Sequence, residues 1–409
     1  MSFVRNKFAE YYQSNSSSIQ PPTSIEKREF GFLLLKERFM LRHRSFENVN
    51  VLRSFLKTSV PSDAYYSGAY YEKPEEKMEE KGWLGADLIF DIDADHIPTP
   101  CDKTHDSWVC KNCGTTDKGP RPEKCPKCRE QKFDEKIWPC EVCLETAKAE
   151  TLKLIDILSK DFGFSLDEMR VSFSGHRGYH LHIEHEQVRD MDQIARKEIV
   201  DYVVGIGLEV TLHGLEETSL GNRSRILLGP NLDERGWRGR IARGTYEFLL
   251  TATPEDLKRI GLKRHVVKTL LEQRESLLES WKAKGPWGTM KNIGVDSWKK
   301  IALHGAQMQA AKIDTVVTTD IHRLIRLNDS LHGKTGFKKI NIPTKSIEDF
   351  DPFKGGIAFK DGSVTVFVSD SPQLRIGEQI YEPLKEQKIK LPTAVALLLL
   401  CKGAATVVE

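Results

Sequence analysis

The sequence predicts an α+β fold in which a sheet-based core carries an inserted zinc-binding module and a helical subdomain. Strand-like segments flank a charged stretch with helical periodicity, and seven of the eight cysteines lie between Cys101 and Cys143. The 409 residues also exceed the roughly 250–300 at which single cores stop growing. We therefore expect a discontinuous core over residues 1–250 and 310–409, the zinc-binding module at 96–144 and the helical subdomain at 251–309.

The core elements are predicted from local patterns. A polar run at residues 14–23 predicts a loop, so we expect the folded core to start near residue 24. Periodicity then predicts, in order, a buried strand at 86–91, a helix at 145–161, a strand, turn and strand at 169–183, and further strands at 315–317 and 357–368. The later strands imply that the sheet is built from both sides of the helical stretch.

The composition limits the function classes. The 61 Lys and Arg residues nearly balance the 59 Asp and Glu residues, so any contact with nucleic acid must come from local basic patches. Residues 1–13 lack the continuous apolar stretch of a signal peptide. The longest apolar run, residues 394–401, is far shorter than the roughly 20 residues that cross a bilayer, and it predicts a buried helix. We expect a soluble, cytoplasmic protein.

Three acidic residues lie at the end of the predicted strand at 86–91 and directly after it. Asp91, Asp93 and Asp95 alternate along the chain, and alternate side chains of an extended chain share one face. Carboxylates packed that closely repel one another unless cations neutralise them, which favours a divalent ion such as Mg2+ or Mn2+. The segment alone also fits a solvated acidic turn, or a haloacid-dehalogenase-type phosphohydrolase with a D-x-D nucleophile motif. Asp95 occupies a position where that enzyme class prefers Thr or Val.

A basic turn lies between the two strand-like arms of residues 171–182. Gly175 and Gly178 let backbone N–H groups approach an anion closely. Arg177 can hold phosphate oxygens through two guanidinium nitrogens, and His180 can add a hydrogen bond. The turn therefore resembles a triphosphate cradle. For the motif taken alone, an ordinary hairpin with incidental histidines is the alternative.

Three motifs occur in a fixed order along the chain. Asp91-Ile92-Asp93, residues 174–180 (SGHRGYH) and residues 330–336 (SLHGKTG) resemble the signature motifs of the archaeo-eukaryotic primase small-subunit family of the archaeal type. Residues 28–32, 42–46 and 138–143 are similar to the same family. The resemblance implies a primase-type catalytic core with a mixed sheet. It also implies an enzyme that makes short primers on single-stranded DNA from NTPs or dNTPs, by two-metal nucleotidyl transfer with release of pyrophosphate.

The resemblance also implies which residues form the site. The family has Asp-x-Asp plus a distant aspartate, and Asp314 matches the distant position, so Asp91, Asp93 and Asp314 are the expected catalytic ligands of Mg2+ or Mn2+. We prefer Asp314 to Asp320 because it opens a β-branched run, whereas Asp320 falls where a helix N-cap is expected. The expected nucleotide-binding residues are Ser174, Arg177, His180, Arg326 and His332. Asn328-Asp329 departs from the proline-containing turn that the family often has before its last motif.

The cysteine spacing predicts metal sites. Two C-x2-C pairs, Cys110/Cys113 and Cys125/Cys128, form a pattern typical of a structural zinc ribbon. The pair Cys140/Cys143 needs two more ligands, for which Cys101 and His105 are the candidates. We favour two zinc sites, and we expect the ribbon to be an excursion that the core can lose without losing activity. One zinc ion, with Cys140 and Cys143 as a reduced pair, is the alternative.

Other features concern partners. Two basic clusters could follow a DNA backbone, although such runs more often only keep a surface solvated; they are Lys118, Arg121, Lys124, Lys127, Arg129 and Lys132, and Arg223, Arg225, Arg235, Arg238, Arg240 and Arg243. The resemblance implies a heterodimer with a large iron–sulfur primase subunit. Two other functions share these features: a repair primase-polymerase of the same superfamily, and a noncatalytic zinc-ribbon protein that binds nucleic acid.

Overall fold

The structure is a computed structural model that describes residues 2–35, 39–220, 224–282, 285–287 and 293–408. The chain forms two compact units. The core unit comprises Met1–Leu152, Leu166–Lys197 and Lys312–Glu409, and the helical unit comprises Lys153–Ser165 and Glu198–Ala311. Secondary structure is therefore mixed α and β, as the sequence predicts.

The first sheet of the core unit has the strand order β14-β3-β1-β2. Its strands are β1 (Phe30–Leu34), β2 (Met40–Arg44), β3 (Pro61–Ser67) and β14 (Leu324–Arg326). Helices α1 (Ser2–Asn15) and α2 (Val49–Ser59) contribute to the same hydrophobic cluster as β1 and β3. The expectation that the folded core starts near residue 24 is wrong, because Phe8, Tyr11 and Tyr12 form a buried aromatic stripe on α1.

The second sheet has the order β15-β10-β11-β6. It consists of β6 (Leu88–Asp93), β10 (Met169–Phe173), β11 (Gly178–Ile183) and β15 (Ile340–Ile342). Ile89 of β6 belongs to the cluster that contains Phe30 and Tyr66, so the two sheets share a core. Every described strand pair in both sheets is antiparallel, so the expected mixed sheet is wrong. A tight hairpin joins β10 to β11, and such a turn requires antiparallel strands.

The cysteine-rich insertion forms a small sheet of its own with the order β8-β7-β9. Helix α3 (Asp102–His105) precedes it, and the strands are β7 (Ser107–Cys110), β8 (Thr116–Lys118) and β9 (Phe133–Lys136). Trp108 and Phe133 pack edge to face against each other beside the cysteines, with ring centroids 5.2 Å apart. The chain then enters α4 (Glu141–Lys160), which begins four residues earlier than the predicted helix.

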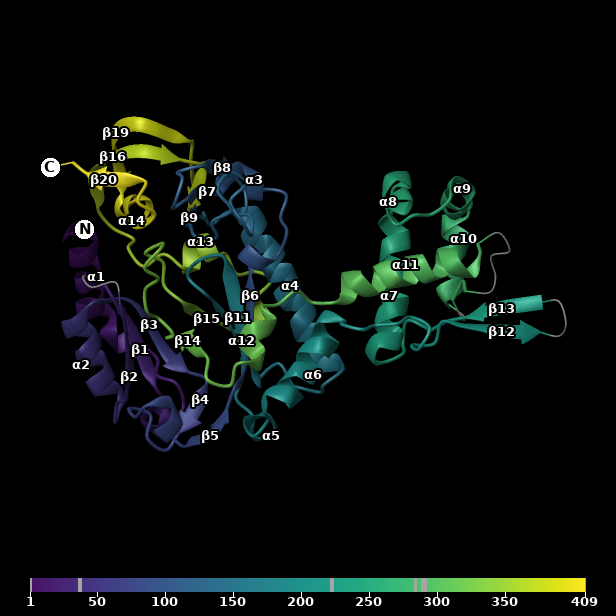
Figure 1. Ribbon diagram of the computed structural model, residues 1–409, viewed down its shortest axis with the longest axis horizontal. Coiled ribbons are helices and arrows are strands. Elements are labelled where there is room, and N and C mark those ends of the chain that lie inside the picture. Colours follow the sequence, from purple (N-terminus) through teal and green to yellow (C-terminus); the bar gives the residue numbers. More distant parts are fainter. Residues whose placement is uncertain (1, 36–38, 221–223, 283–284, 288–292, 409) are drawn as a thin grey trace. The chain divides into compact units, whose positions relative to one another are not determined.

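One of the remaining elements of the core unit differs from the sequence prediction. The β-branched run after Asp314, expected as a strand, forms the helix α12 (Thr315–Thr319) beside β6 (Figure 1). The run at 394–401 forms the helix α14 (Thr393–Cys401), which is buried as predicted, and Cys401 packs against the core. The others are β4 (Ala69–Tyr71), β5 (Trp83–Ala86), α5 (Glu186–Arg189), α13 (Pro352–Gly355), β16 (Ser363–Ser371), β17 (Leu374–Ile376), β18 (Gln379–Tyr381), β19 (Leu384–Pro392) and β20 (Ala405–Val407). Helix α6 (Gln193–Val204) begins in the core unit and continues into the helical unit.

The helical unit is larger than the subdomain expected at 251–309. It contains α7 (Gly236–Thr251), α8 (Pro254–Arg259), α9 (Arg264–Glu272), α10 (Arg274–Glu279) and α11 (Val295–Gln309), with a hairpin of β12 (Glu216–Leu220) and β13 (Ser224–Leu228). A Cβ on Gly244 of α7 would lie 2.1 Å from the Gly305 carbonyl oxygen of α11, so only glycine allows this helix crossing. Arg240, from the second basic cluster, is buried in ion pairs with Asp156 and Asp161 and is therefore structural. Arg223 lies outside the described residues.

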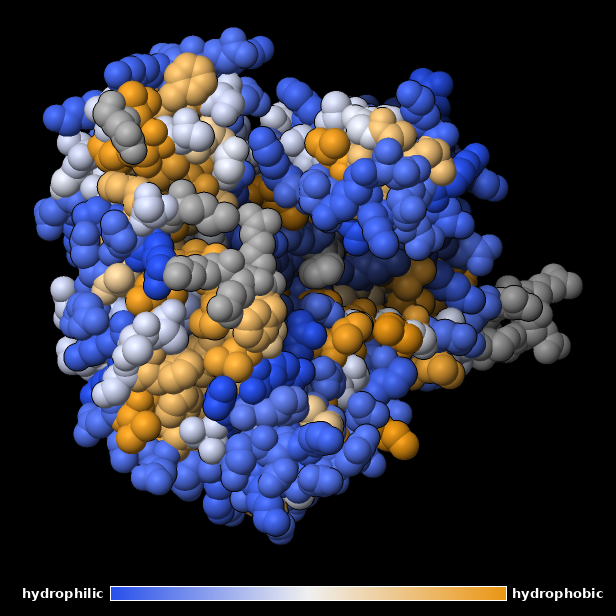
Figure 2. All heavy atoms as spheres, turned by 60° about the vertical axis from the view of Figure 1, so that its left-hand side comes forward, coloured by the Kyte–Doolittle hydropathy of each residue, from blue (hydrophilic) through white to orange (hydrophobic). Residues whose placement is uncertain are grey.

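Figure 2 shows a face on which hydrophilic side chains predominate and hydrophobic ones form scattered patches. Among the described residues, no helix combines the length and the apolar character that a membrane span requires.

Candidate functional site

The strands β6 and β11 bring the first two motifs together. Their register places Asp91 opposite His180 and Asp93 opposite Gly178. His180 Nε2 lies 3.5 Å from Asp91 Oδ1. A Cβ on Gly178 would lie 2.2 Å from the Ile92 carbonyl oxygen, so glycine is required for β11 to approach the carboxylate strand. Asp91 and Asp93 point to the same face because they are two residues apart on one strand.

Asp314 joins these carboxylates from a distant part of the chain. Its main-chain N–H donates to the Asp91 carbonyl oxygen at 2.8 Å. Its side chain caps the N-terminus of α12 and accepts the Val316 N–H at 3.0 Å. The argument that assigned the strand start to Asp314 and the helix cap to Asp320 is therefore wrong, since the capping bond prevails over β propensity. Asp320 instead lies at the C-terminal end of α12.

The carboxylates repel one another in the structure. Burial, followed by the charges of Asp93 and Asp314, raises the pKa of Asp91 to about 7. Oxygens of Asp93 and Asp95 lie within 4.8 Å of each other and of a His176 ring nitrogen. Among the described residues, Asp91, Asp93 and Asp314 do not form a set that tight. The three carboxylates are thus close enough for the charges of Asp93 and Asp314 to act on Asp91.

The turn after β10 is shaped by Ser174. Its hydroxyl oxygen accepts the N–H groups of His176 and Gly178, both at 3.3 Å. The Ser174 hydroxyl, expected to contact phosphate, is therefore already used to stabilise the turn. Gly175 has φ +85°, a conformation that favours glycine.

Arg177 is enclosed by two carboxylates. Its side chain is 1% exposed, with Nε 3.2 Å from Asp95 Oδ1 and Nη1 2.5 Å from Asp106 Oδ2. A cavity of about 480 Å3 opens beside it. Arg177, Asp95, Asp106 and Lys334 line this cavity together with Gly119, Pro120 and Arg121 of the inserted module. The ribbon is thus one wall of the candidate site and not a separate excursion.

Arg326 and His332 lie in the same basic region. Arg326 Nη1 is 2.5 Å from Asp63 Oδ1. Burial alone would raise the pKa of Asp63, but the charge of Arg326 and the Gly333 N–H hold it at about 2. The His332 ring stacks on His176, with centroids 5.0 Å apart.

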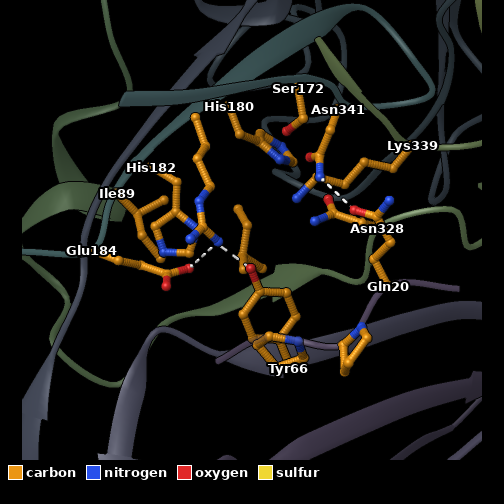
Figure 3. A pocket seen from close by; sticks show the side chains of 14 residues that line it. Gln20, Tyr66, Ile89, Ser172, His180, His182, Glu184, Asn328, Lys339 and Asn341 are labelled. Carbon is orange, nitrogen blue, oxygen red and sulfur yellow. Dashed lines mark hydrogen bonds and ion pairs between the residues drawn. The ribbon is translucent and has the colours of Figure 1, made fainter. Parts of the chain in front are cut away.

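A smaller hollow of about 50 Å3 is lined by His180 and by residues of both sheets (Figure 3). Its wall includes His180, Ser172 and Lys339, whose Nζ donates to the Arg326 carbonyl oxygen at 2.8 Å. His180 Nδ1 is buried and has no hydrogen-bond partner among the described residues. Burial, with the charge of Lys339, lowers the pKa of His180 well below its usual range. The neutral His180 ring therefore keeps one buried nitrogen whose hydrogen-bonding capacity is unused.

The cysteines form two sets of four ligands. The inner cluster is Cys101, His105, Cys140 and Cys143, and the ribbon cluster is Cys110, Cys113, Cys125 and Cys128; within each, the ligand atoms all lie within 4.8 Å of one another. In the inner cluster, Cys143 Sγ lies 3.4 Å from both Cys101 Sγ and His105 Nε2. Each cluster could hold one metal ion, and the structure groups the eight residues as the spacing suggests.

Comparison with known proteins decides the family. A family model for the DNA primase small subunit matches residues 134–344. The chain is 34% identical to the DNA primase small subunit PriS of Methanothrix thermoacetophila and 33% identical to that of Archaeoglobus fulgidus, each over 99% of this chain and 98% of the relative. It is 31% identical to PriS of Nitrosopumilus maritimus over the same shares. The chain belongs to the DNA primase small subunit family.

Membership of the primase family decides against the phosphohydrolase and the noncatalytic zinc-ribbon alternatives. The matched region contains the basic turn, Asp314 and the last motif, whereas Asp91 and Asp93 precede it and are covered by the full-length relatives.

Several residues of this primase site were missed at the sequence level. Lys402 comes from the end of α14, and its Nζ lies 2.8 Å from His176 Nε2. Asp106 bonds both His105 and Arg177. Lys334 could have been found, because it lies inside the third motif, and Asp106 follows a candidate metal ligand. Lys402 carries no local signal, since only tertiary packing brings it to the turn.

Proposed function

We propose that the chain is the catalytic subunit of a primase, which makes short primers on single-stranded DNA by joining nucleoside triphosphates to a 3′-hydroxyl. The observation that carries the proposal is the register of β6 and β11, which sets Asp91 and Asp93 against the basic turn while the Asp314 N–H bonds Asp91. Oxygen donors with mutual repulsion fit a hard divalent cation. Mg2+ or Mn2+ bound by Asp91, Asp93 and Asp314 would stabilise charge on the attacking oxygen and the triphosphate.

The basic groups supply the complementary half of the site. Burial and then Lys334 lower the pKa of Lys402 to about 7, while burial and then Lys402 lower that of His176. Burial followed by Arg326 lowers the pKa of His332. Cations that crowd one another in this way are relieved by a polyanion. We therefore assign the triphosphate to the cations Arg177 and Arg326, with Lys402 as an addition from outside the motifs. The neutral His180 is assigned to it as a hydrogen-bond partner.

The clusters and partners complete the proposal. Four nitrogen and sulfur ligands are the usual set for structural zinc, so we assign one Zn2+ to each cluster. The family description as a small subunit supports a larger partner subunit, for which the iron–sulfur subunit of primases is our candidate. The relatives are described as DNA primase subunits, which supports a single-stranded DNA template and nucleoside triphosphates as substrates.

A template-dependent synthesis assay tests this function. Purified chain, with and without the large subunit, is incubated with single-stranded DNA, Mg2+ or Mn2+, and either ribonucleotides or deoxyribonucleotides. We expect labelled products that require the template. Lys402→Ala should raise the nucleotide KM several-fold with little change in kcat, because it removes one phosphate contact. Absence of product under every condition contradicts the proposal.

A further inference from the structure

One carboxylate connects the inner cluster to the proposed nucleotide site. Asp106 Oδ1 lies 2.6 Å from His105 Nδ1 and accepts the Trp138 main-chain N–H at 3.1 Å. Asp106 Oδ2 accepts Arg177 Nη1 at 2.5 Å. The Asp106 side chain is 8% exposed and that of Arg177 is 1% exposed, so water competes little for these contacts.

The arrangement on the cluster side is that of a supported metal ligand. His105 Nε2 faces the cluster, 3.4 Å from Cys143 Sγ, while Nδ1 faces Asp106. A histidine that binds a metal through one ring nitrogen usually donates its other ring N–H to a carboxylate, which fixes the ring and strengthens the ligand. The three thiols and one imidazole fit zinc by type and number. Zinc bound there would hold the His105 ring and, through it, the Asp106 carboxylate.

On the side of the proposed nucleotide site, Asp106 fixes the position of Arg177. Of the two carboxylates that the structure describes against Arg177, Asp95 is the more exposed at 30% and the more distant at 3.2 Å. Asp106 is buried and closer, and it belongs to the segment that carries the cluster. Arg177 can therefore exchange Asp95 for a phosphate while Asp106 keeps the guanidinium aligned with the cavity that both residues line.

We propose that Asp106 is a positioning residue that couples zinc in the inner cluster to nucleotide binding by Arg177. This inference rests on the proposed role of Arg177 in holding the triphosphate. A zinc-loaded cluster raises nucleotide affinity and, because such coupling is reciprocal, bound nucleotide raises zinc affinity by the same factor.

Titration of a non-hydrolysable nucleoside triphosphate tests the coupling without catalysis. Asp106→Asn should weaken both nucleotide binding and zinc binding by about tenfold, the lower end of the effect of losing a carboxylate that supports a metal-bound histidine. Asp134→Asn is the matched control, because Asp134 lies in the same module but is 74% exposed and pairs with Lys111. It should change neither affinity. His105→Ala should weaken nucleotide binding as Asp106→Asn does, and the double variant should be no weaker than either single one.

The outcomes separate this inference from the proposed function. If Arg177→Ala leaves nucleotide affinity unchanged, the phosphate role of Arg177 fails. If Arg177→Ala weakens binding but Asp106→Asn binds nucleotide as the wild type does, the coupling through Asp106 is overturned. A measurement on the unaltered chain covers variants that do not fold: with Co2+ in place of zinc, nucleotide should shift the absorption bands of the inner cluster. No shift in the wild type also overturns the coupling.

Discussion

The inner cluster and the ribbon cluster have four ligands each but differ in what they connect. The ribbon cluster closes within nineteen residues, around a small sheet with its own Trp108–Phe133 contact. The inner cluster takes ligands from both ends of the insertion, and His105 leads through Asp106 to Arg177. The difference teaches that a ligand set does not reveal how much a metal site matters. Its importance depends on the contacts made by its ligands.

The proposed catalytic carboxylates should show the largest effect on activity, and both clusters can be compared with them. Asp91→Ala should reduce nucleotide joining by about a thousandfold or more, since it removes an electrostatic contribution to the transition state. The fold should persist and the melting temperature should not fall, because burial and the neighbouring carboxylates already raise the pKa of Asp91 to about 7. The measurements are primer synthesis and thermal unfolding without divalent metal. Asp320→Ala is the control and should retain activity.

Loss of the inner cluster should have the next largest effect. Cys140→Ser with Cys143→Ser should lower the free energy of unfolding by about 3 kcal/mol or more. The metal no longer holds His105, so the buried ion pair between Asp106 and Arg177 loses its support. Elemental analysis should fall from two zinc ions per chain to one. A double variant that keeps both its stability and two zinc ions would show that the inner cluster is not a metal site.

Acid unfolding sharpens the comparison by removing both metals. Below about pH 4 the ligands are protonated and both clusters release zinc, so the stabilities of the wild type and the cluster variants should converge.

Burial alone would raise the pKa of Asp87, but His182 and Arg28 hold it at about 2. Its folded pKa lies below the unfolded value of about 3.9, so its contribution of about 2.6 kcal/mol is complete above about pH 5 and is lost progressively as the pH falls towards about 1. Denaturant titrations at several pH values should therefore show that the free energy of unfolding falls less steeply with decreasing pH in Asp87→Asn than in the wild type.

Loss of the ribbon cluster should have the smallest effect. Cys110→Ser with Cys113→Ser should leave the stability of the core unit within about 0.5 kcal/mol. Because Gly119, Pro120 and Arg121 line the cavity beside Arg177, the nucleotide KM should still rise by about threefold, the scale of one exposed ionic contact. Steady-state kinetics check this. An unchanged KM would show that the ribbon does not contribute to nucleotide binding and is the independent excursion that its spacing suggests.

The sequence predicted the elements whose signals are local. The strand β6, the β10–β11 hairpin, the buried helix α14 and the two C-x2-C pairs of the ribbon all follow from patterns within a few residues. The helix α12 was missed because a single capping carboxylate decided the conformation of a β-branched run. Helix α1 was missed because its buried face consists of three aromatic residues in an otherwise polar segment.

The site was predictable where its residues lie in motifs. Asp106 and Lys402 act through contacts with Arg177 and His176, which lie 71 and 226 residues away in sequence. No spacing rule covers such distances. The two carboxylates that enclose Arg177 were also unforeseen, because charge compensation in a buried turn depends on segments that only tertiary packing brings together.

The order in which the ribosome produces these parts has a consequence for incomplete chains. Cys143 is the last ligand of either cluster, whereas Asp314 is about 170 residues later and Lys402 is almost at the end of the chain. Synthesis runs at about 5–20 residues per second. The nascent polypeptide would therefore carry the complete ligand sets of both clusters for about 10–30 s before Asp314, the third proposed metal-binding aspartate, is made. A fragment released in that interval would bind zinc but lack Asp314, so it could not join nucleotides, and aborted translation should yield inactive products and not error-prone polymerases.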